Sequence, residues 1–384
     1  MLCELYKAAL LLMLWTWQAP DWPIYRYQAS ALEKLEARFM HQSGVLRGSL
    51  AHVQSCDKAP LTIHWITEEA HQTSEIEGEL LNRDSLQSSI RRHFGLATDH
   101  RRIPPAEAGI AEMMMELYQG HSAPVTHERL FSWHRSLTRS RGDLQEVGSY
   151  RSGGDPMQVV SGPIHEPKVH FEAPPAAAMP AEMAAFLTWF IRTAPDGEAP
   201  LPALTRAGIA HLYFVTIHPF EDGNGRIARA LAGKAIAENL GYPALVPLSQ
   251  TINRARKEYY AQLQQANHSL EITPWLCYFA QLVVKAQAQA QAEVEFLISK
   301  TRFFDLHRGC FNDRQEKVLL RLFQEGPAGF TGGLSAEKYI RITGTSRPTA
   351  TRDLHDLVEK SALYRTGQLR GTRYHLNLPM AHPL

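Results

Sequence analysis

The sequence predicts a mainly α-helical protein with one small β-hairpin in its central part and a separate C-terminal domain. Three observations support this class. Apolar residues recur at spacings of three and four along most of the chain, which is the period of an amphipathic helix. Residues 142–175 are instead rich in Gly, Pro and Val and alternate over short runs. Residues 300–384 carry 14 Lys and Arg against 8 Asp and Glu, whereas the whole chain has 40 against 39.

Length and composition limit the number and class of domains. The chain has 384 residues, which at roughly 150 residues per domain predicts two or three domains. With 44% hydrophobic and 21% charged residues, disordered, collagen-like and disulfide-rich classes are excluded. The four cysteines form no CxxC pair, so we expect no disulfide, no thiolate metal site and a reducing, cytoplasmic location. The domains expected are a leader at 1–12, an N-terminal helical domain at 13–100, a central domain at 101–299 and a C-terminal domain at 300–384.

The first residues contain an apolar run, Ala8 to Trp17, that follows Lys7. A secretory signal has this order, but Glu4 lies in the charged region and no Ala-x-Ala-like cleavage site follows. The run is also too short to span a bilayer. We therefore expect no membrane segment, and a translation start at Met13 is an alternative explanation of the leader.

Caps and periodicity define the helices on either side of residues 142–175. Gly44 and Gly48 are expected to end the first helix. The Ala-Gln tract at 286–292 alternates like a strand, but both residue types favour helix and neither is β-branched, so we expect a long solvated helix. The helices expected are one from residue 27, one from Asn82 or Asp84 to Phe94, one opened by Pro104 and Pro105 and running to Tyr118, then 181–193, 205–217, one closed by Gly241, and one through 286–292.

The stretch at 142–175 contains two short alternating runs, MQVVSGP and KVHFEAPP. Two such runs separated by turn residues are typical of a β-hairpin. We therefore expect a hairpin-like flap in an otherwise helical body.

The string most informative about chemistry is HPFEDGNGRIAR at residues 218–229. It predicts a helix that ends at His218, a tight turn, and a second helix whose first amides point back into that turn. Gly223 and Gly225 let the backbone approach a ligand, and the helix N-terminus adds its positive dipole end. Phe220 should anchor the turn in the core. The string therefore predicts an anion-binding site.

The polar side chains of the string indicate which anion it binds. Arg226 and Arg229 are three residues apart and share one helix face, and two guanidinium groups suit a polyphosphate. Asp222 offers the hard oxygen ligand that Mg²⁺ takes beside phosphates. His218 titrates near neutrality and is the natural general base for a hydroxyl. A calcium loop is excluded, because Arg226 and Ile227 stand where an EF-hand needs an oxygen ligand and a glycine.

The string resembles the signature of the Fic (Fic/DOC) family, HxFx(D/E)GNGRxxR, at every defined position. The resemblance implies a helical bundle with a small β-hairpin flap that transfers AMP from ATP to a Ser, Thr or Tyr hydroxyl of a protein. It makes His218 the base for that hydroxyl and Asp222 the Mg²⁺ ligand, and the flap would align the target by strand addition. The nucleotide would contact Gly223, Asn224, Gly225, Arg226 and Arg229, and the flap would consist of Met157, Gln158, Val159, Val160 and Ser161.

A second string, TSEIEG at residues 73–78, resembles the inhibitory motif (S/T)xxxE(G/N) of the Fic subclass with an N-terminal inhibitory helix. Glycine accepts the left-handed conformation just past a helix end, so Glu77 would be the last helical residue, with its carboxylate paired with Arg229. ATP would then bind with its triphosphate misplaced for in-line attack. Two alternatives stay open: Glu77 positions a water that removes AMP from a modified protein, or Glu77 is a solvated helix residue.

Two further segments extend the resemblance. Tyr259 and Tyr260 would line the adenine pocket, as similarly placed aromatic residues do in the family, and core packing is the alternative for one of them. The segment DWPIYRY at residues 21–27 resembles the start of the domain that precedes the catalytic core in many bacterial members.

The C-terminal domain shows three amphipathic helices followed by an alternating segment with two glycines. The helices are expected at 313–325, at 334–340, and from a cap at Thr345 or Ser346. Helix, turn, helix, hairpin resembles a winged helix, which binds the major groove of DNA or docks to a protein. The candidate DNA contacts are Arg347, Thr349, Arg352, Arg370 and Arg373.

The sequence therefore indicates two candidate functions. The first is an autoinhibited protein adenylyltransferase with ATP as substrate and Mg²⁺ as cofactor, whose target is a protein hydroxyl, including one on the chain itself. The second is a DNA-binding regulator that uses the Fic domain as a nucleotide sensor. DNA and a second copy of the chain, forming a homodimer, are the other candidate partners, and no membrane partner is expected.

Overall fold

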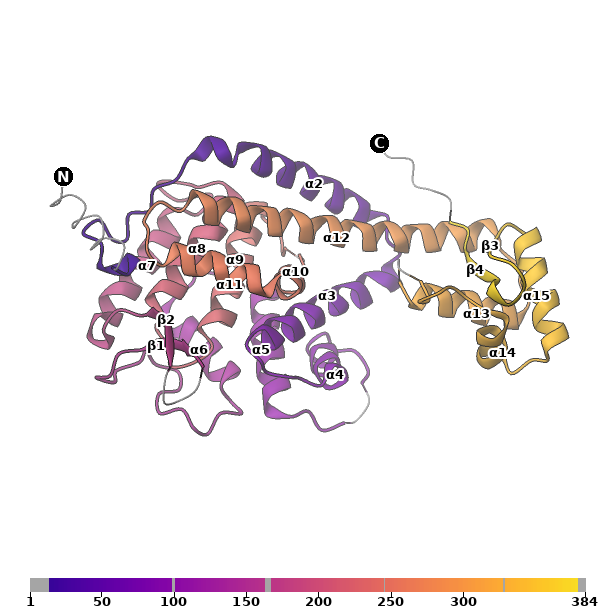
Figure 1. The fold of residues 1–384 in the computed structure, drawn as a ribbon, viewed down its shortest axis with the longest axis horizontal. Coiled ribbons are helices and arrows are strands. Elements are labelled where there is room, and N and C mark those ends of the chain that lie inside the picture. Colours follow the sequence, from indigo (N-terminus) through magenta and orange to yellow (C-terminus); the bar gives the residue numbers. More distant parts are fainter. Residues whose placement is uncertain (1–13, 99–100, 163–166, 245, 327–328, 379–384) are drawn as a thin grey trace. The chain divides into compact units, whose positions relative to one another are not determined.

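Figure 1 shows the computed structural model, which describes residues 14–98, 101–162, 167–244, 246–326 and 329–378. The chain forms two compact units. The first consists of the residues up to Ser43 and of Pro60–Gln287, and the second of Gly44–Ala59 and Ala288–Leu384. The leader expected at 1–12 lies outside the described residues. In the part of the chain that is described, no helix combines the length and the apolar character needed to cross a membrane.

The N-terminal half of the chain is helical, as predicted. The cap expected at Asn82 is present, because its side chain accepts a hydrogen bond from the Ser85 amide at 2.9 Å. The prediction that Gly44 and Gly48 end the first helix was wrong. Glycine costs only about 1 kcal/mol inside a helix, and the helix continues past both glycines, burying Leu46. The elements are η1 (Thr16–Gln18), η2 (Ala29–Ala31), α2 (Glu33–Ala51), α3 (Ser55–Ile76), α4 (Arg83–His93), α5 (Pro105–Gln119) and α6 (His127–Leu137).

The predicted hairpin is present as two antiparallel strands, β1 (Gln158–Ser161) and β2 (Lys168–Glu172). Their register pairs Val159 with Phe171 and is interrupted by an irregularity between Val159 and Val160. Phe171 is buried, whereas β1 is exposed along its whole length. The base of the hairpin is therefore fixed in the first unit, and β1 leaves one edge unpaired in the described structure.

The core of the first unit surrounds α8 (Ala203–Ile217), which buries every residue except Val215. A helix buried on all sides explains why its apolar residues do not form a single stripe. The Ala-Gln tract lies within the long helix α12, so the prediction of helix at 286–292 is confirmed. The expectation that this stretch is solvated was wrong on one face, because Ala286, Gln287 and Ala290 are buried. The remaining elements around α8 are η3 (Ala176–Ala178), α7 (Met179–Arg192), α9 (Asn224–Leu240), α10 (Leu248–Arg254), α11 (Arg256–Ala266) and α12 (Thr273–Leu306).

The second unit has its own core, formed by residues such as Phe303, Leu319, Tyr339 and Leu354. Its elements follow the expected order of three helices and a hairpin, with Ser346 at the start of the third helix. The two strands are antiparallel and pair Leu363 with Leu376. The elements are α13 (Asp313–Gln324), α14 (Ala336–Thr343), α15 (Arg347–Glu359), β3 (Leu363–Thr366), η4 (Leu369–Gly371) and β4 (Arg373–Leu376).

Candidate active site

His218 ends α8 in the left-handed conformation, with φ 52° and ψ 59°. This conformation is uncommon for a residue with a β-carbon and costs of order 1–3 kcal/mol unless its surroundings hold it. The His218 amide still donates to Phe214 at 3.0 Å, and Pro219 then prevents the helix from continuing. The backbone therefore turns at His218 and directs the next residues into a loop.

The side chain of Asn224 closes this loop. It accepts a hydrogen bond from the Phe220 amide at 3.0 Å and donates to the Phe220 carbonyl at 2.7 Å. Phe220 is fully buried, as predicted, and its ring stacks on His134 at 4.3 Å. We expected Asn224 at the phosphates, but its side chain is occupied here, because the buried backbone groups of Phe220 need hydrogen-bond partners.

Asn224→Ala is therefore expected to lower the free energy of unfolding by about 1–3 kcal/mol, since it leaves buried polar groups of Phe220 unpaired. Chemical denaturation measures this change. The matched control is Asn253→Ala, which removes one half-buried contact with the side chain of Gln72. Equal stabilities of the two variants would show that Asn224 does not hold the loop.

The turn before α9 has the backbone of an anion-binding site. Gly223 has φ +80°, a conformation that favours glycine, and directly precedes the first residue of α9. The first amides of a helix have no partner within the helix and attract negative charge. A side chain at Gly225 would begin 2.2 Å from Oε1 of Glu77. A carboxylate of the chain itself therefore lies against the backbone at the start of α9.

Glu77 reaches this position from the end of α3. The helix ends at Ile76, one residue earlier than expected, and Gly78 has φ +83°. The Gly78 amide donates to Glu75 and the Glu79 amide donates to Ser74, each at 3.0 Å. This is the Schellman pattern of a glycine-terminated helix. It turns the chain so that Glu77 and Glu79 both project toward the start of α9.

Arg229 is enclosed by the end of α3. Its guanidinium contacts Glu77 at 2.8 Å and donates to the hydroxyl and carbonyl of Thr73 at 2.7 and 2.9 Å. Its side chain is only 1% exposed. Burial by itself lowers the pKa of Arg229, but the Glu77 carboxylate outweighs this effect and raises it. The pairing expected between Glu77 and Arg229 is thus present in the structure, and Thr73, the first residue of the inhibitory string, supports it.

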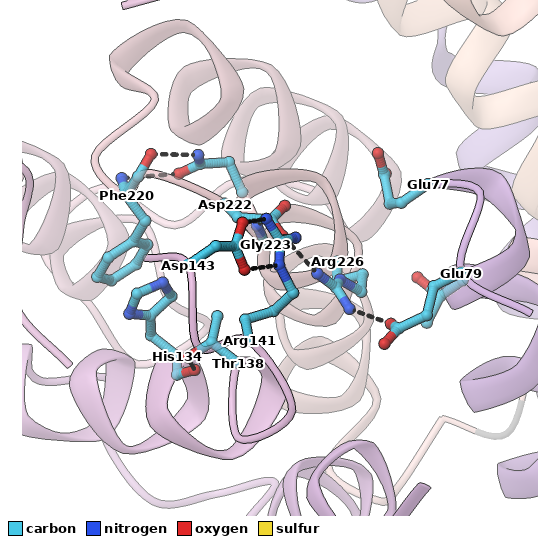
Figure 2. A network of polar contacts seen from close by, with 12 residues as sticks. Glu77, Glu79, His134, Thr138, Arg141, Asp143, Phe220, Asp222, Gly223 and Arg226 are labelled. Atoms are coloured by element: carbon cyan, nitrogen blue, oxygen red, sulfur yellow. Dashed lines mark hydrogen bonds and ion pairs between the residues drawn. The ribbon is translucent and has the colours of Figure 1, made fainter. Parts of the chain in front are cut away.

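Arg226 and Asp222 are also paired. Arg226 contacts Glu79 at 2.5 Å and Asp222 at 3.4 Å. Asp222 forms a second ion pair with Arg141, which is itself held by Asp143 at 2.6 and 2.7 Å. Figure 2 shows this row of alternating charges across the loop. The sequence analysis did not identify Glu79, Arg141 and Asp143. Glu79 lies two residues after Glu77, whereas no spacing connects Arg141 and Asp143 with residues 218–229.

The His218 imidazole is unprotonated at neutral pH, and its pKa lies below the near-neutral value expected from the sequence. Burial lowers its pKa to about 4, and the charge of Arg151 acts in the same direction. Its Nδ1 lies 3.2 Å from the Val215 carbonyl. A carbonyl only accepts hydrogen bonds, so Nδ1 carries the proton and Nε2 is free of one at neutral pH. Phe171 of β2 lies beside the ring, with centroids 6.4 Å apart, so the base of the flap adjoins this imidazole.

The fit of the site to Mg²⁺ rests on Asp222. The described residues contain no cluster of three or more His, Cys, Asp or Glu side chains that would bind a metal by themselves. Mg²⁺ at nucleotide sites is held by one or two carboxylates together with phosphates. The partly exposed carboxylate of Asp222, at the entrance to the α9 turn, fits that role when a nucleotide supplies the other oxygens.

The two tyrosines proposed for adenine differ in position. Tyr259 is 1% exposed and its hydroxyl bonds to His211 Nε2 at 2.9 Å, so it belongs to the core. Tyr260 is 41% exposed, lies near Arg256, and its hydroxyl donates to the Ile76 carbonyl at 3.4 Å. Neighbouring residues on a helix point about 100° apart. Only Tyr260 therefore remains a candidate for stacking on a base.

The flap residues occupy the positions that strand addition requires. Gln158, Val159, Val160 and Ser161 are exposed on β1, and Met157 is half-buried before it. Ser161 also contacts His170 of β2 at 2.6 Å. Target docking at this edge stays a prediction.

The candidate DNA contacts are not equivalent. Arg347, Arg352 and Arg370 are exposed, whereas Thr349 is half-buried and its hydroxyl contacts Ser346. Arg373 donates to backbone carbonyls of its own hairpin at 2.8 and 3.2 Å, so its guanidinium is partly committed.

Comparisons with known proteins show which families and proteins this chain is similar to. Residues 124–235 match the model of the Fic/DOC family, and residues 15–96 match a domain described as of unknown function, DUF4172. Protein adenylyltransferase Fic of Nematostella vectensis is 33% identical over 215 residues, which is 55% of this chain and 45% of that protein. Protein adenylyltransferase fic-1 of Caenorhabditis briggsae is 25% identical over 256 residues, 65% of this chain and 46% of its own. The chain thus spans less than half the length of these relatives.

A crystal structure of a Fic family protein from Desulfovibrio desulfuricans G20 shares the fold. It covers 92% of this chain and 98% of its own, with a TM-score of 0.53 and 23% sequence identity. The mainly helical fold expected from the sequence is therefore confirmed, and this solved Fic family protein shares it.

Proposed function

We propose that the chain is a Fic-family protein adenylyltransferase, which transfers AMP from ATP to a Ser, Thr or Tyr hydroxyl of a protein and releases pyrophosphate. The observation that carries the proposal is the juxtaposition of an unprotonated His218 with the anion-binding start of α9. The Fic/DOC match over residues 124–235 and the adenylyltransferase relatives support it.

Each residue of the site has a separate role in the proposed reaction. Nε2 of His218 takes the proton of the target hydroxyl, whose oxygen forms a bond to the α-phosphorus while the bond to the β-phosphate oxygen breaks. The backbone at Gly223 and Gly225 and the guanidinium groups of Arg226 and Arg229 neutralise the phosphates. Mg²⁺ held by Asp222 would add positive charge to the triphosphate.

In the structure these charged groups are paired with one another or with other parts of the chain. Glu77 forms an ion pair with Arg229, Glu79 with Arg226, and Arg141 with Asp222. A triphosphate must replace the carboxylates before both arginines bind it. The proposed enzyme is therefore autoinhibited, and Glu77 is the main inhibitory residue because it also lies against Gly225.

Mass spectrometry of the intact protein tests the reaction class. The full chain is incubated with ATP and Mg²⁺, alone and with a cell lysate that supplies target proteins. We expect a mass gain of one AMP on the chain or on lysate proteins, strongest with Glu77→Gly and absent with His218→Ala. A gain of one phosphate, or an adduct that persists in His218→Ala, would overturn the proposal.

DNA binding by the C-terminal unit is a second candidate function, favoured by the exposed Arg347 and Arg352 at the start of α15. Replacing both by Ala is expected to weaken binding to duplex DNA and to reduce the salt slope by about 1 for each arginine that neutralised a phosphate. A gel shift at several salt concentrations measures this. The matched control is Arg308→Ala, an exposed arginine that pairs with Asp305. Equal binding by the control and the double variant would exclude α15 as the DNA-binding element.

A further inference from the structure

Arg151 contacts the loop that follows α8 at His218 and the segment that follows the flap. Its main-chain amide donates to the Pro219 carbonyl at 2.9 Å, and its Nε donates to the His218 carbonyl at 2.8 Å. Its Nη2 donates to Pro174 at 2.5 Å and lies 3.4 Å from the Ile217 carbonyl. One buried residue, 6% exposed, therefore contacts the end of α8, the catalytic histidine and the segment after the flap.

The partners of this guanidinium are unusual for a buried charge. They are backbone carbonyls, and in the described part of the chain no ion pair joins Arg151 to a carboxylate. Arg206, which is also buried, has Glu238 at 2.7 Å. Burying a charge without an opposite charge is costly. The last carbonyls of α8 offset part of this cost, because they have no partner within the helix and carry the negative end of its dipole.

The segment that carries Arg151 is itself anchored. The ring of the preceding residue, Tyr150, packs on Phe131 and Phe220 at centroid distances of 4.7 and 5.5 Å, and its hydroxyl contacts His127 at 2.7 Å. Arg151 precedes β1, and Pro174 follows β2. The side chain thus connects both ends of the flap with His218, whose left-handed backbone needs external support.

We propose that Arg151 is a positioning residue that holds His218 in its left-handed conformation and fixes the target-docking flap relative to the imidazole. The proposal rests on the proposed function, in which the flap presents the hydroxyl and His218 removes its proton. The distance between the flap and the His218 imidazole must stay constant for the hydroxyl oxygen to be aligned with the α-phosphorus. A misplacement of about 1 Å is enough to cost a hundredfold in rate.

The charge of Arg151 has a second consequence. The charged groups that act on the His218 imidazole are Arg151, which lowers its pKa, and Glu77 and Asp222, which raise it. Loss of the guanidinium therefore raises the pKa of His218. A residue with only a structural role, away from the imidazole, would not produce this change.

The test uses the full chain in the Glu77→Gly background. Arg151→Ala is expected to lower kcat for AMP transfer about a hundredfold, to leave the affinity for ATP unchanged, and to regain activity when guanidinium ion is added. Arg151→Lys keeps the charge but lacks the planar guanidinium whose Nε and Nη2 reach the His218 and Pro174 carbonyls together, so it should lose kcat while retaining the low pKa of His218. NMR titration measures that pKa, with the signal assigned by its absence in His218→Ala.

The matched control is Arg206→Ala, which removes a buried arginine paired with Glu238. It is expected to lower thermal stability without changing the His218 titration and without rescue by guanidinium. An unchanged kcat in Arg151→Ala, or an unchanged His218 pKa in a folded Arg151→Ala, would overturn the positioning role. If no variant transfers AMP, the proposed function fails, whereas the titration still tests the contact between Arg151 and His218.

Discussion

Glu77→Gly is expected to raise the rate of AMP incorporation by about ten- to a hundredfold, the range of a typical coupling free energy between sites. The carboxylate that is removed pairs with Arg229 at 2.8 Å and lies against Gly225. Its removal frees one guanidinium and the start of α9 for the triphosphate. Incorporation of radioactive AMP into the chain and into lysate proteins measures the rate.

The matched control is Glu75→Gly, two residues earlier on α3, whose half-exposed carboxylate contacts only the neighbouring His71 at 3.9 Å among the ion pairs described. This variant should label like the wild type. Glu79 pairs with Arg226, and this pair is expected to persist in Glu77→Gly, so adding Glu79→Gln is expected to raise incorporation further. Equal labelling by the wild type and Glu77→Gly would show that the carboxylate does not inhibit.

His218→Ala, made in the Glu77→Gly background, is expected to reduce AMP transfer by about a hundred- to ten-thousandfold, the usual contribution of a general base. ATP binding, measured by calorimetry, should stay unchanged, because in the proposed complex the phosphates contact α9 and the arginines rather than His218. His218→Asn separates the two roles of the side chain: it retains an N–H donor near the Val215 carbonyl but cannot take a proton. Full activity of His218→Asn would rule out proton removal by this residue.

The pH profile provides an independent check. Burial lowers the pKa of His218 to about 4, so the imidazole is unprotonated at pH 7 and becomes protonated only as the pH falls toward that value. The rate of AMP transfer should therefore be flat near neutrality and decline on the acidic side. A decline centred near 6.5, the ordinary value, would show that the imidazole is solvated in the active state.

Several features of the site could be predicted from short stretches of sequence. The turn at Gly223, the start of α9 and the end of α3 at Gly78 each depend on a few consecutive residues. Cap and turn chemistry operate over that range. The expectation that Gly44 and Gly48 end a helix was wrong, although it used the same rule that glycine ends helices. There the packing of neighbouring residues outweighs the preference of glycine, and α2 continues to Ala51.

Other features could not be predicted, since the relevant contacts join distant parts of the chain. The side chain of Asn224 satisfies the backbone of Phe220, a role that its position in the motif does not indicate. Tyr259 and Tyr260 are adjacent and chemically alike, and burial distinguishes the core residue from the exposed one.

Local sequence was enough to predict the helical class, the hairpin and the glycine turn before α9, because periodicity and glycine positions are local properties. The pairing of Glu77 with Arg229 joins residues far apart in the sequence, and we expected it from the family resemblance. Tertiary packing alone brings Glu79 to Arg226, Arg141 to Asp222 and Arg151 to His218. These contacts span 147, 81 and 67 residues. Charged side chains are common along the chain, and which of them meet depends on how α3, α6 and the flap pack around α8.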